Sequence, residues 1–189
     1  MKNKILVIVG ASGTGKSKIS DYICKKYNIP RIITHTTRAP RYNEINGLDY
    51  YFENDKSFEQ VQYIERVTYD GYKYGSSYIG LHKAFEKNNI VSIILDTQGA
   101  RSYVKKLGCE VQILYITVSN FDLLKDRIKN RGDYNEQVIS RLSSKENQRD
   151  LTIPEDLIPF SKIIYNDNWE DTKKQLNFII NNILGEKNE

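Results

Sequence analysis

The sequence has little of what marks stapled, fibrous or membrane-spanning chains. Only 2 cysteines and 4 prolines occur among its 189 residues, and neither Cys24 nor Cys109 belongs to a C-x-x-C pair, so neither a disulfide framework nor a cysteine-based metal site is expected. The longest apolar run, residues 5–11 with Gly10 included, is far shorter than the roughly 18 residues of a membrane-spanning helix. These shortages exclude collagen, a disulfide scaffold and a helical membrane protein.

Histidine is scarce too, and charge of either sign is nearly balanced. His35 and His82 have no catalytic partners at a recognisable spacing, so we expect structural or surface roles for both. The formal net charge of +4, from 28 Lys and Arg against 24 Asp and Glu, is not gathered in one tract, and it suits small phosphorylated ligands better than nucleic acid or a membrane. Residues 1–11 lack the features of a signal peptide, so we expect a cytoplasmic protein.

What the sequence does have is an alternation of short apolar runs and helical patterns. The runs that predict strands cover residues 4–9, 32–34, 90–95, 111–118 and 162–165. The helical patterns cover residues 17–27, 57–63, 78–88, 121–129, 135–149 and 169–184. This alternation predicts an α/β fold in which helices flank both faces of a parallel sheet. Two polar insertions, at about residues 34–80 and 122–150, are expected to stand over the carboxyl ends of the strands.

The strongest motif follows the first predicted strand. It is the octapeptide Gly10-Ala11-Ser12-Gly13-Thr14-Gly15-Lys16-Ser17, which fits G-x-x-x-x-G-K-[ST]. In such a P-loop, backbone N–H groups converge on phosphate oxygens at the N-terminus of a helix. The Lys16 ammonium would neutralise the β- and γ-phosphates, and the Ser17 hydroxyl is a ligand for Mg²⁺. The motif therefore predicts a nucleoside triphosphate site, and Asp96 lies where a P-loop protein places a metal- or substrate-facing acid.

A second feature indicates where the phosphate goes. Arg38 and Arg41 lie three residues apart in the first insertion, a spacing that suits two guanidinium groups gripping one dianionic phosphate. A second phosphate site beside a triphosphate site indicates transfer from one phosphate to another.

Together these motifs resemble those of one family. The combination consists of the P-loop, Thr-Thr-Arg-Ala-Pro-Arg at 36–41, Gly-Leu-Asp-Tyr-Tyr-Phe at 47–52, Tyr-Gly-Ser at 74–76, Asp-Thr-Gln-Gly-Ala at 96–100 and Asn-Arg-Gly at 130–132. It resembles the guanylate kinases, P-loop enzymes that phosphorylate GMP with ATP, over nearly the whole chain. The resemblance implies a P-loop NTPase core formed by residues 1–33, 81–121 and 151–189, a GMP-binding insertion at 34–80, and a lid at 122–150.

The resemblance also implies roles for individual residues on the acceptor side. The residues that match the family's clamp on the GMP phosphate are Arg38, Arg41, Tyr50 and Tyr74. The residues that match its guanine-reading set are Thr34, Glu65, Ser76 and Asp96. A carboxylate at position 65 suits guanine, because guanine presents N1–H and N2–H₂ as donors whereas adenine presents an acceptor at N1.

On the donor side, Arg131 and Arg141 match the family's lid arginines, which act with Lys16 in catalysis, and Asn166 matches a contact with adenine. The chain departs from the family at Ile94, where an acid is usual, so we expect Mg²⁺ to depend on Ser17 and Asp96.

The resulting prediction is a Mg-ATP-dependent kinase of GMP and dGMP, a monomer or a homo-oligomer. Two alternatives stay open. The chain could phosphorylate another phosphorylated small molecule, or it could be a non-catalytic interaction domain of the same fold, although such domains typically have degraded P-loops.

Overall fold

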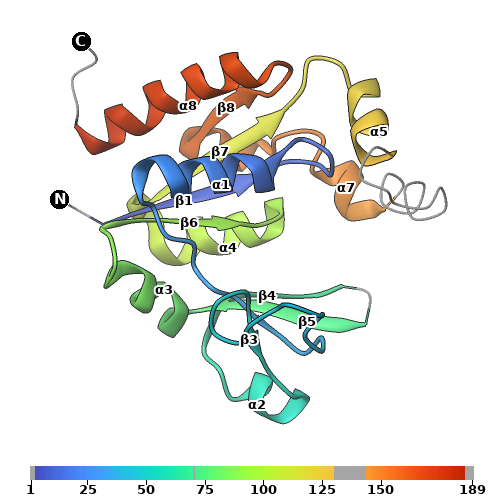
Figure 1. Ribbon diagram of the computed structural model, residues 1–189, viewed down its shortest axis with the longest axis vertical. Helices are drawn as coiled ribbons and strands as arrows, with labels where there is room; N and C mark the ends of the chain where they lie inside the picture. Colours follow the sequence, from blue (N-terminus) through green and yellow to red (C-terminus); the bar gives the residue numbers. More distant parts are fainter. Residues whose placement is uncertain (1–2, 70, 130–143, 186–189) are drawn as a thin grey trace.

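The computed structural model describes residues 3–69, 71–129 and 144–185 (Figure 1). These residues form two four-stranded sheets. The first sheet is parallel, with the order β6-β1-β7-β8, and its strands are β1 (Lys4–Val9), β6 (Ile90–Ile94), β7 (Val111–Thr117) and β8 (Ser161–Tyr165). The four apolar runs that predict its strands are thus confirmed, and so is the α/β fold class.

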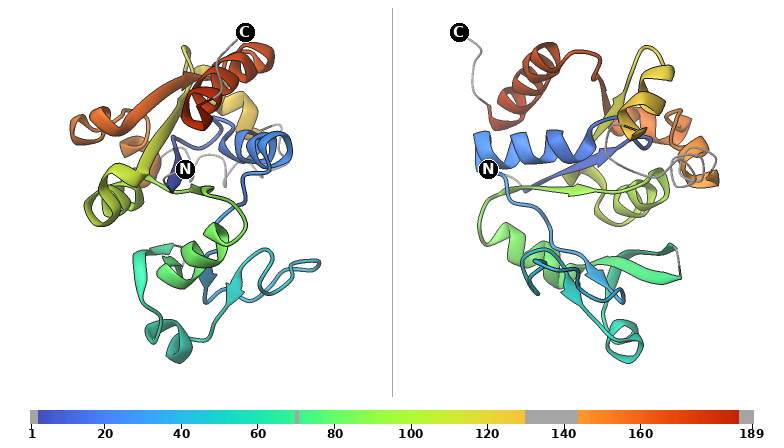
Figure 2. Two further views of the ribbon diagram at one scale, coloured as in Figure 1. Left: turned by 90° about the vertical axis from the view of Figure 1, so that its left-hand side faces the viewer. Right: turned by 45° about the vertical axis from the view of Figure 1, so that its right-hand side comes forward.

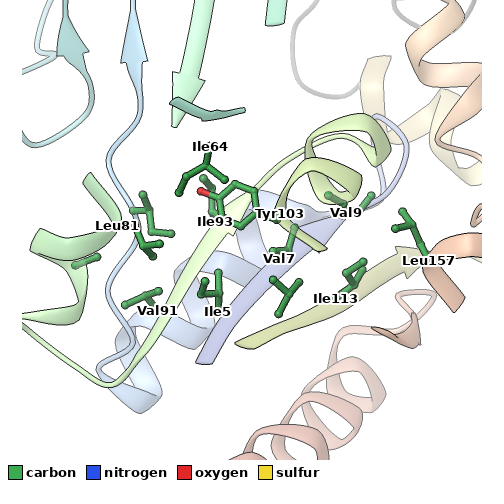
Figure 3. Packing of buried hydrophobic residues seen from close by; sticks show 14 of the residues in the cluster. Ile5, Val7, Val9, Ile64, Leu81, Val91, Ile93, Tyr103, Ile113 and Leu157 are labelled. Atoms are coloured by element: carbon green, nitrogen blue, oxygen red, sulfur yellow. The ribbon is translucent and has the colours of Figure 1, made fainter. Parts of the chain in front are cut away.

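Helices cover both faces of the parallel sheet because β1 is apolar on both. Ile5, Val7 and Val9 face the side of α4 (Thr97–Leu107), in a core cluster that also holds Tyr103 and Ile113 (Figure 3). The alternate residues of β1, Leu6 and Ile8, join a second cluster on the opposite face. The helices on that face are α1 (Lys16–Tyr27) and α8 (Trp169–Leu184). A strand buried on both sides lies at the centre of the sheet, as its unbroken apolar run requires.

The second sheet stands beside the first, with α3 (Tyr78–Phe85) between them (Figure 2). Its order is β3-β2-β5-β4, and its strands are β2 (His35–Thr36), β3 (Tyr51–Phe52), β4 (Tyr63–Tyr69) and β5 (Tyr72–Ser77). β4 and β5 form an antiparallel hairpin. Ile64 of β4 and Leu81 of α3 are buried in the same core cluster as β1, so the second sheet is fixed to the first by packing.

Shorter elements complete the described chain. They are α2 (Asp55–Glu59), η1 (Gly108–Glu110), α5 (Asp122–Lys129), α7 (Lys145–Arg149) and η2 (Glu155–Phe160). No helix among the described residues is both long and apolar enough to pass through a bilayer.

Three expectations about the elements differ from the structure. Residues 32–34 form no strand: Arg31 makes an isolated bridge to Ser92, the Ile32 N–H donates to the Ser92 carbonyl oxygen, and β2 starts only at His35. The helix expected at 57–63 is wrong in its second half, since α2 ends at Glu59 and β4 begins at Tyr63. Helix α4 was not predicted, and of the helix expected at 135–149 only residues 144–149 are described, with 145–149 forming α7.

Candidate functional site

The P-loop connects β1 to α1 in a backbone conformation that needs glycine. Gly10, Gly13 and Gly15 have φ angles of 146°, 84° and 95°, values that residues with a side chain rarely adopt. A Cβ atom at Gly10 would collide with the carbonyl oxygen of Ile116, and one at Gly15 with the side-chain amide of Asn166. The loop is therefore held tightly against β7 and β8, with its N–H groups at the start of α1.

The cation of the motif lies over this loop. Lys16 Nζ is 2.6 Å from the carbonyl oxygen of Gly10 and 2.8 Å from that of Ala11. From this position the ammonium group and the positive end of the α1 dipole act on the same space. The arrangement is an anion site in which one charge is carried by a side chain and the other by the backbone.

The side chain of Asn166 holds the P-loop in place through hydrogen bonds. Its Nδ2 donates to the carbonyl oxygen of Thr14 at 2.7 Å, and its Oδ1 accepts from Thr172 Oγ1 at 2.9 Å. The side chain is buried, so this hydrogen-bonded brace ties the loop to α8. The expected contact between Asn166 and adenine stays a prediction.

A cavity of about 530 Å³ opens between the P-loop and the second sheet. Its lining includes eight predicted site residues, namely Gly10, Ser12, Lys16, Thr34, Tyr50, Glu65, Tyr74 and Asp96. The structure thus brings the loop predicted for the donor and several residues predicted for the acceptor to one space. Ser76 lies directly behind this wall, whereas Arg38, Arg41 and Ser17 are not part of the lining.

Glu65 presents a carboxylate to the cavity. Its Oε1 accepts two hydrogen bonds from Ser76, from the backbone N–H at 3.0 Å and from the hydroxyl at 2.9 Å. Burial raises the pKa of Glu65, and the two bonds from Ser76 act against that rise. These bonds fix one oxygen of the carboxylate to β5.

Arg38 lies beside the cavity, and its guanidinium group is paired. Nη2 is 2.8 Å from Glu44 Oε1, and the group lies 5.4 Å from the centre of the Tyr50 ring. The hydrogen bond from Arg38 lowers the pKa of Glu44, whose other oxygen accepts from the backbone N–H of Arg41. Glu44 was not among the predicted residues, and it organises both arginines of the motif, although the Arg41 side chain is exposed.

Asp96 ends the segment after β6 and is held on both sides. Oδ1 accepts from the Gly99 N–H at 2.7 Å and so caps α4, while Oδ2 accepts from Arg149 Nη2 at 2.7 Å. Arg149 also lies 3.2 Å from Asp150, a buried carboxylate that accepts from the Thr97 hydroxyl at 2.6 Å. Arg149 and Asp150 were missed, and their charged segment carried no signal that set them apart.

The described residues contain no group of three or more His, Cys, Asp or Glu that could hold a metal ion. Ser17 is exposed at the start of α1, and its role as a ligand of Mg²⁺ stays a prediction. A direct bond from Asp96 to a metal would have to compete with the Arg149 guanidinium. The predicted catalytic arginines Arg131 and Arg141 lie outside the described residues.

Comparisons with known proteins agree over most of the chain. A family model described as guanylate kinase matches residues 2–183. The guanylate kinase of Neisseria gonorrhoeae is 32% identical over 185 residues, which cover 95% of this chain and 88% of that protein. The enzyme of the same name from Rickettsia felis is 32% identical over 189 residues, with 95% of each chain covered.

A further relative and a solved structure extend the match. The guanylate kinase of Schizosaccharomyces pombe is 29% identical over 186 residues, covering 95% of this chain and 91% of that protein. A crystal structure of guanylate kinase from Anaplasma phagocytophilum has a TM-score of 0.60 at 21% identity, and covers 96% of this chain and 86% of that chain. This second likeness establishes the fold alone.

Proposed function

Because the chain belongs to the guanylate kinase family, we propose that it transfers the γ-phosphoryl group of ATP to the phosphate of GMP or dGMP. The observation that carries this proposal is the single cavity lined by both Lys16 of the P-loop and Glu65 of the second sheet. A triphosphate site and an acceptor site must share one space for direct transfer between them.

On the donor side, the P-loop amides and Lys16 would hold the β- and γ-phosphates of ATP. Mg²⁺ enters with ATP as part of the substrate, and Ser17 is the protein ligand that fits it. The ion would neutralise part of the phosphate charge. Asp96 would act on this ion only through water, since its Oδ2 is bound to Arg149.

On the acceptor side, two sets of residues would bind the nucleotide at its two ends. The phosphate set is Arg38, Arg41, Tyr50 and Tyr74, and the guanine set is Thr34, Glu65, Ser76 and Asp96, of which Ser76 is fully buried and would act through Glu65. Glu65 lines the cavity and Ser76 bonds its Oε1, so the carboxylate would accept from the N1–H and N2–H₂ groups of guanine. Adenine would place the lone pair of N1 against it.

The chemistry needs positioning and charge rather than a base. An oxygen of the GMP phosphate attacks the γ-phosphorus of ATP, a new P–O bond forms, the bond to the ADP oxygen breaks, and ADP leaves with the electron pair. The attacking phosphate is already anionic at pH 7, so no proton has to be removed. Lys16, Arg131 and Arg141 would stabilise the charge on the transferred group. Residues 122–150 would form the lid, residues 34–80 the acceptor-binding region, and the remaining residues the P-loop core.

Product analysis with Mg-ATP and each of GMP, dGMP, AMP, CMP and UMP tests this proposal. We expect GDP and dGDP to form with equal amounts of ADP, and Lys16→Ala to abolish turnover while the protein stays folded. Turnover with a different phosphorylated acceptor alone would contradict the choice of substrate. ATP binding without turnover on any nucleotide would favour a binding domain instead.

A further inference from the structure

Tyr103 of α4 stands behind the wall of the cavity and touches neither the cavity nor solvent. Its side chain is fully buried, at 0% exposure, and Figure 3 shows its ring within the core cluster with the hydroxyl oxygen turned towards Ile64. The hydroxyl lies 2.9 Å from Ser76 Oγ. Ser76 is also at 0% exposure, and its Oγ lies 2.9 Å from Glu65 Oε1.

Glu65, Ser76 and Tyr103 form a chain of hydrogen bonds, and only one arrangement of the hydroxyl protons satisfies both side-chain bonds. An ionised carboxylate accepts hydrogen bonds and donates none, so the one proton of the Ser76 hydroxyl goes to Glu65. The lone pairs of Ser76 Oγ then accept the proton of the Tyr103 hydroxyl. Burial raises the pKa of the Tyr103 phenol, so it stays a donor at neutral pH. In a buried chain each bond polarises the next, so the phenol strengthens the bond that Ser76 makes to Glu65.

We propose that Tyr103 is a positioning residue for recognition of the acceptor base: its hydroxyl, acting through Ser76, orients the Glu65 carboxylate towards guanine and keeps it charged. This inference rests on the proposed function, because it requires guanine to be the base that Glu65 reads. It adds a residue that neither contacts the nucleotide nor belongs to any motif in the sequence.

The charges around Glu65 show why such support is needed. Burial and the neighbouring Asp96 raise the pKa of Glu65, whereas the two bonds from Ser76 and the Lys106 ammonium lower it. Lys106 is itself fixed to the backbone beside Glu65, with Nζ 2.7 Å from the carbonyl oxygen of Ile64. A protonated Glu65 would lose its charge and one acceptor position, so GMP affinity must fall as the pH falls through the Glu65 pKa. A weaker bond from Ser76 moves that fall to higher pH.

Tyr103→Phe removes only the hydroxyl, and Tyr63→Phe is its matched control. Tyr63 is a tyrosine of β4 close to Glu65, and its buried hydroxyl has no hydrogen-bond partner among the described residues. The dissociation constant of GMP would be measured by isothermal titration calorimetry from about pH 5.5 to 8, together with kcat at saturating GMP and the thermal midpoint. The GMP phosphate titrates near pH 6 in every sample, so only differences between variants are interpreted.

For Tyr103→Phe we expect the GMP dissociation constant at pH 7 to be roughly three- to tenfold higher than in the wild type. The fall in GMP affinity on acidification should also begin at a higher pH than in the wild type. The kcat value at saturating GMP and the ATP affinity should stay within about twofold, because the transferred group is untouched. Tyr63→Phe should reproduce the wild-type GMP affinity and pH profile. In a Ser76→Ala background, Tyr103→Phe should have no additional effect on GMP affinity, since the chain is already broken.

An unchanged GMP affinity and pH profile in Tyr103→Phe would overturn the inference, even if the thermal midpoint fell, because a lower midpoint alone indicates a purely structural role. An additive effect in the Ser76→Ala background would overturn the route through Ser76. A wild-type protein that binds ATP and not GMP would contradict the proposed function instead, so the two failures are distinguishable.

Discussion

The ion pair between Arg149 and Asp96 joins α7 to the acceptor side of the site, and we expect it to contribute measurably to the free energy of unfolding. Arg149→Met removes a hydrogen bond of 2.7 Å to Asp96 and one of 3.2 Å to Asp150. A buried charge-assisted bond contributes about 1.5–3 kcal/mol, and an exposed pair contributes about 0–1 kcal/mol. The Arg149 and Asp96 side chains are 29% and 27% exposed, so a value between these limits, about 1–2 kcal/mol of unfolding free energy, is expected. With an m-value of about 2 kcal/mol per M in urea, the unfolding midpoint should fall by roughly 0.5–1 M.

The assay is a double-mutant cycle in urea with Arg149→Met, Asp96→Asn and the double variant. A coupling energy of about 1 kcal/mol is expected between the two positions. Arg101→Met with Asp156→Asn is the matched control, because that pair has contacts of 2.7 and 2.9 Å but is 37% and 56% exposed. Its coupling should be under about 0.5 kcal/mol. A coupling between Arg149 and Asp96 below about 0.3 kcal/mol, the level of independent sites, would refute the reasoning.

Three further substitutions probe the supports of the site. Tyr63→Phe should leave the free energy of unfolding unchanged or raise it by up to about 1 kcal/mol, because it removes a buried hydroxyl without a partner among the described residues; a clear loss in urea unfolding would contradict this. His35→Ala should cost about 2–4 kcal/mol by the same measurement, since its buried ring bonds Glu53 and Ser77 at 2.9 Å each, and a cost under about 1 kcal/mol would argue against that network. Asn166→Ala should weaken ATP binding roughly three- to tenfold by calorimetry through loss of the bond to the Thr14 carbonyl, and unchanged ATP affinity would show that the brace is not needed.

The parallel sheet could be predicted because β1, β6 and β7 are buried on both faces, so their continuous apolar runs have no competing interpretation as surface elements. β8 lies at the edge of the sheet and is more exposed, and only its short apolar run predicts it. The second sheet was harder, since β2 and β3 have two residues each, and β4 and β5 are rich in tyrosine and polar residues and lack a continuous apolar run. Helix α4 carries a helical signal in the apolar spacing of Ala100, Tyr103, Val104 and Leu107.

The candidate site likewise contains some residues that a local sequence pattern predicts and others that only the folded structure identifies. The P-loop residues are consecutive, so their conformation follows from a local pattern of glycines between a strand and a helix. Tyr103 contacts Ser76, which lies 27 positions away in the sequence, and Arg149 contacts Asp96, which lies 53 positions away. Glu44 contacts Arg38, which lies 6 positions away. No periodicity or motif in the sequence indicates these contacts. Those of Tyr103 and Arg149 arise only when the sheets and α7 are assembled, and that of Glu44 forms within the loop between β2 and β3.

Guanine recognition by Glu65 is tested most directly by one comparison of kcat/KM for GMP and AMP in the wild type, Glu65→Gln and Glu59→Gln. Glu65→Gln keeps the shape but loses the charge that accepts from N1–H and N2–H₂. We expect the GMP value to fall about 10²- to 10³-fold, while Glu59→Gln, an exposed residue paired with Arg66 and Lys73, stays within about twofold of the wild type. The wild type should use GMP and not AMP. Full GMP activity in Glu65→Gln, or equal use of AMP by the wild type, would contradict the proposed reading of the acceptor.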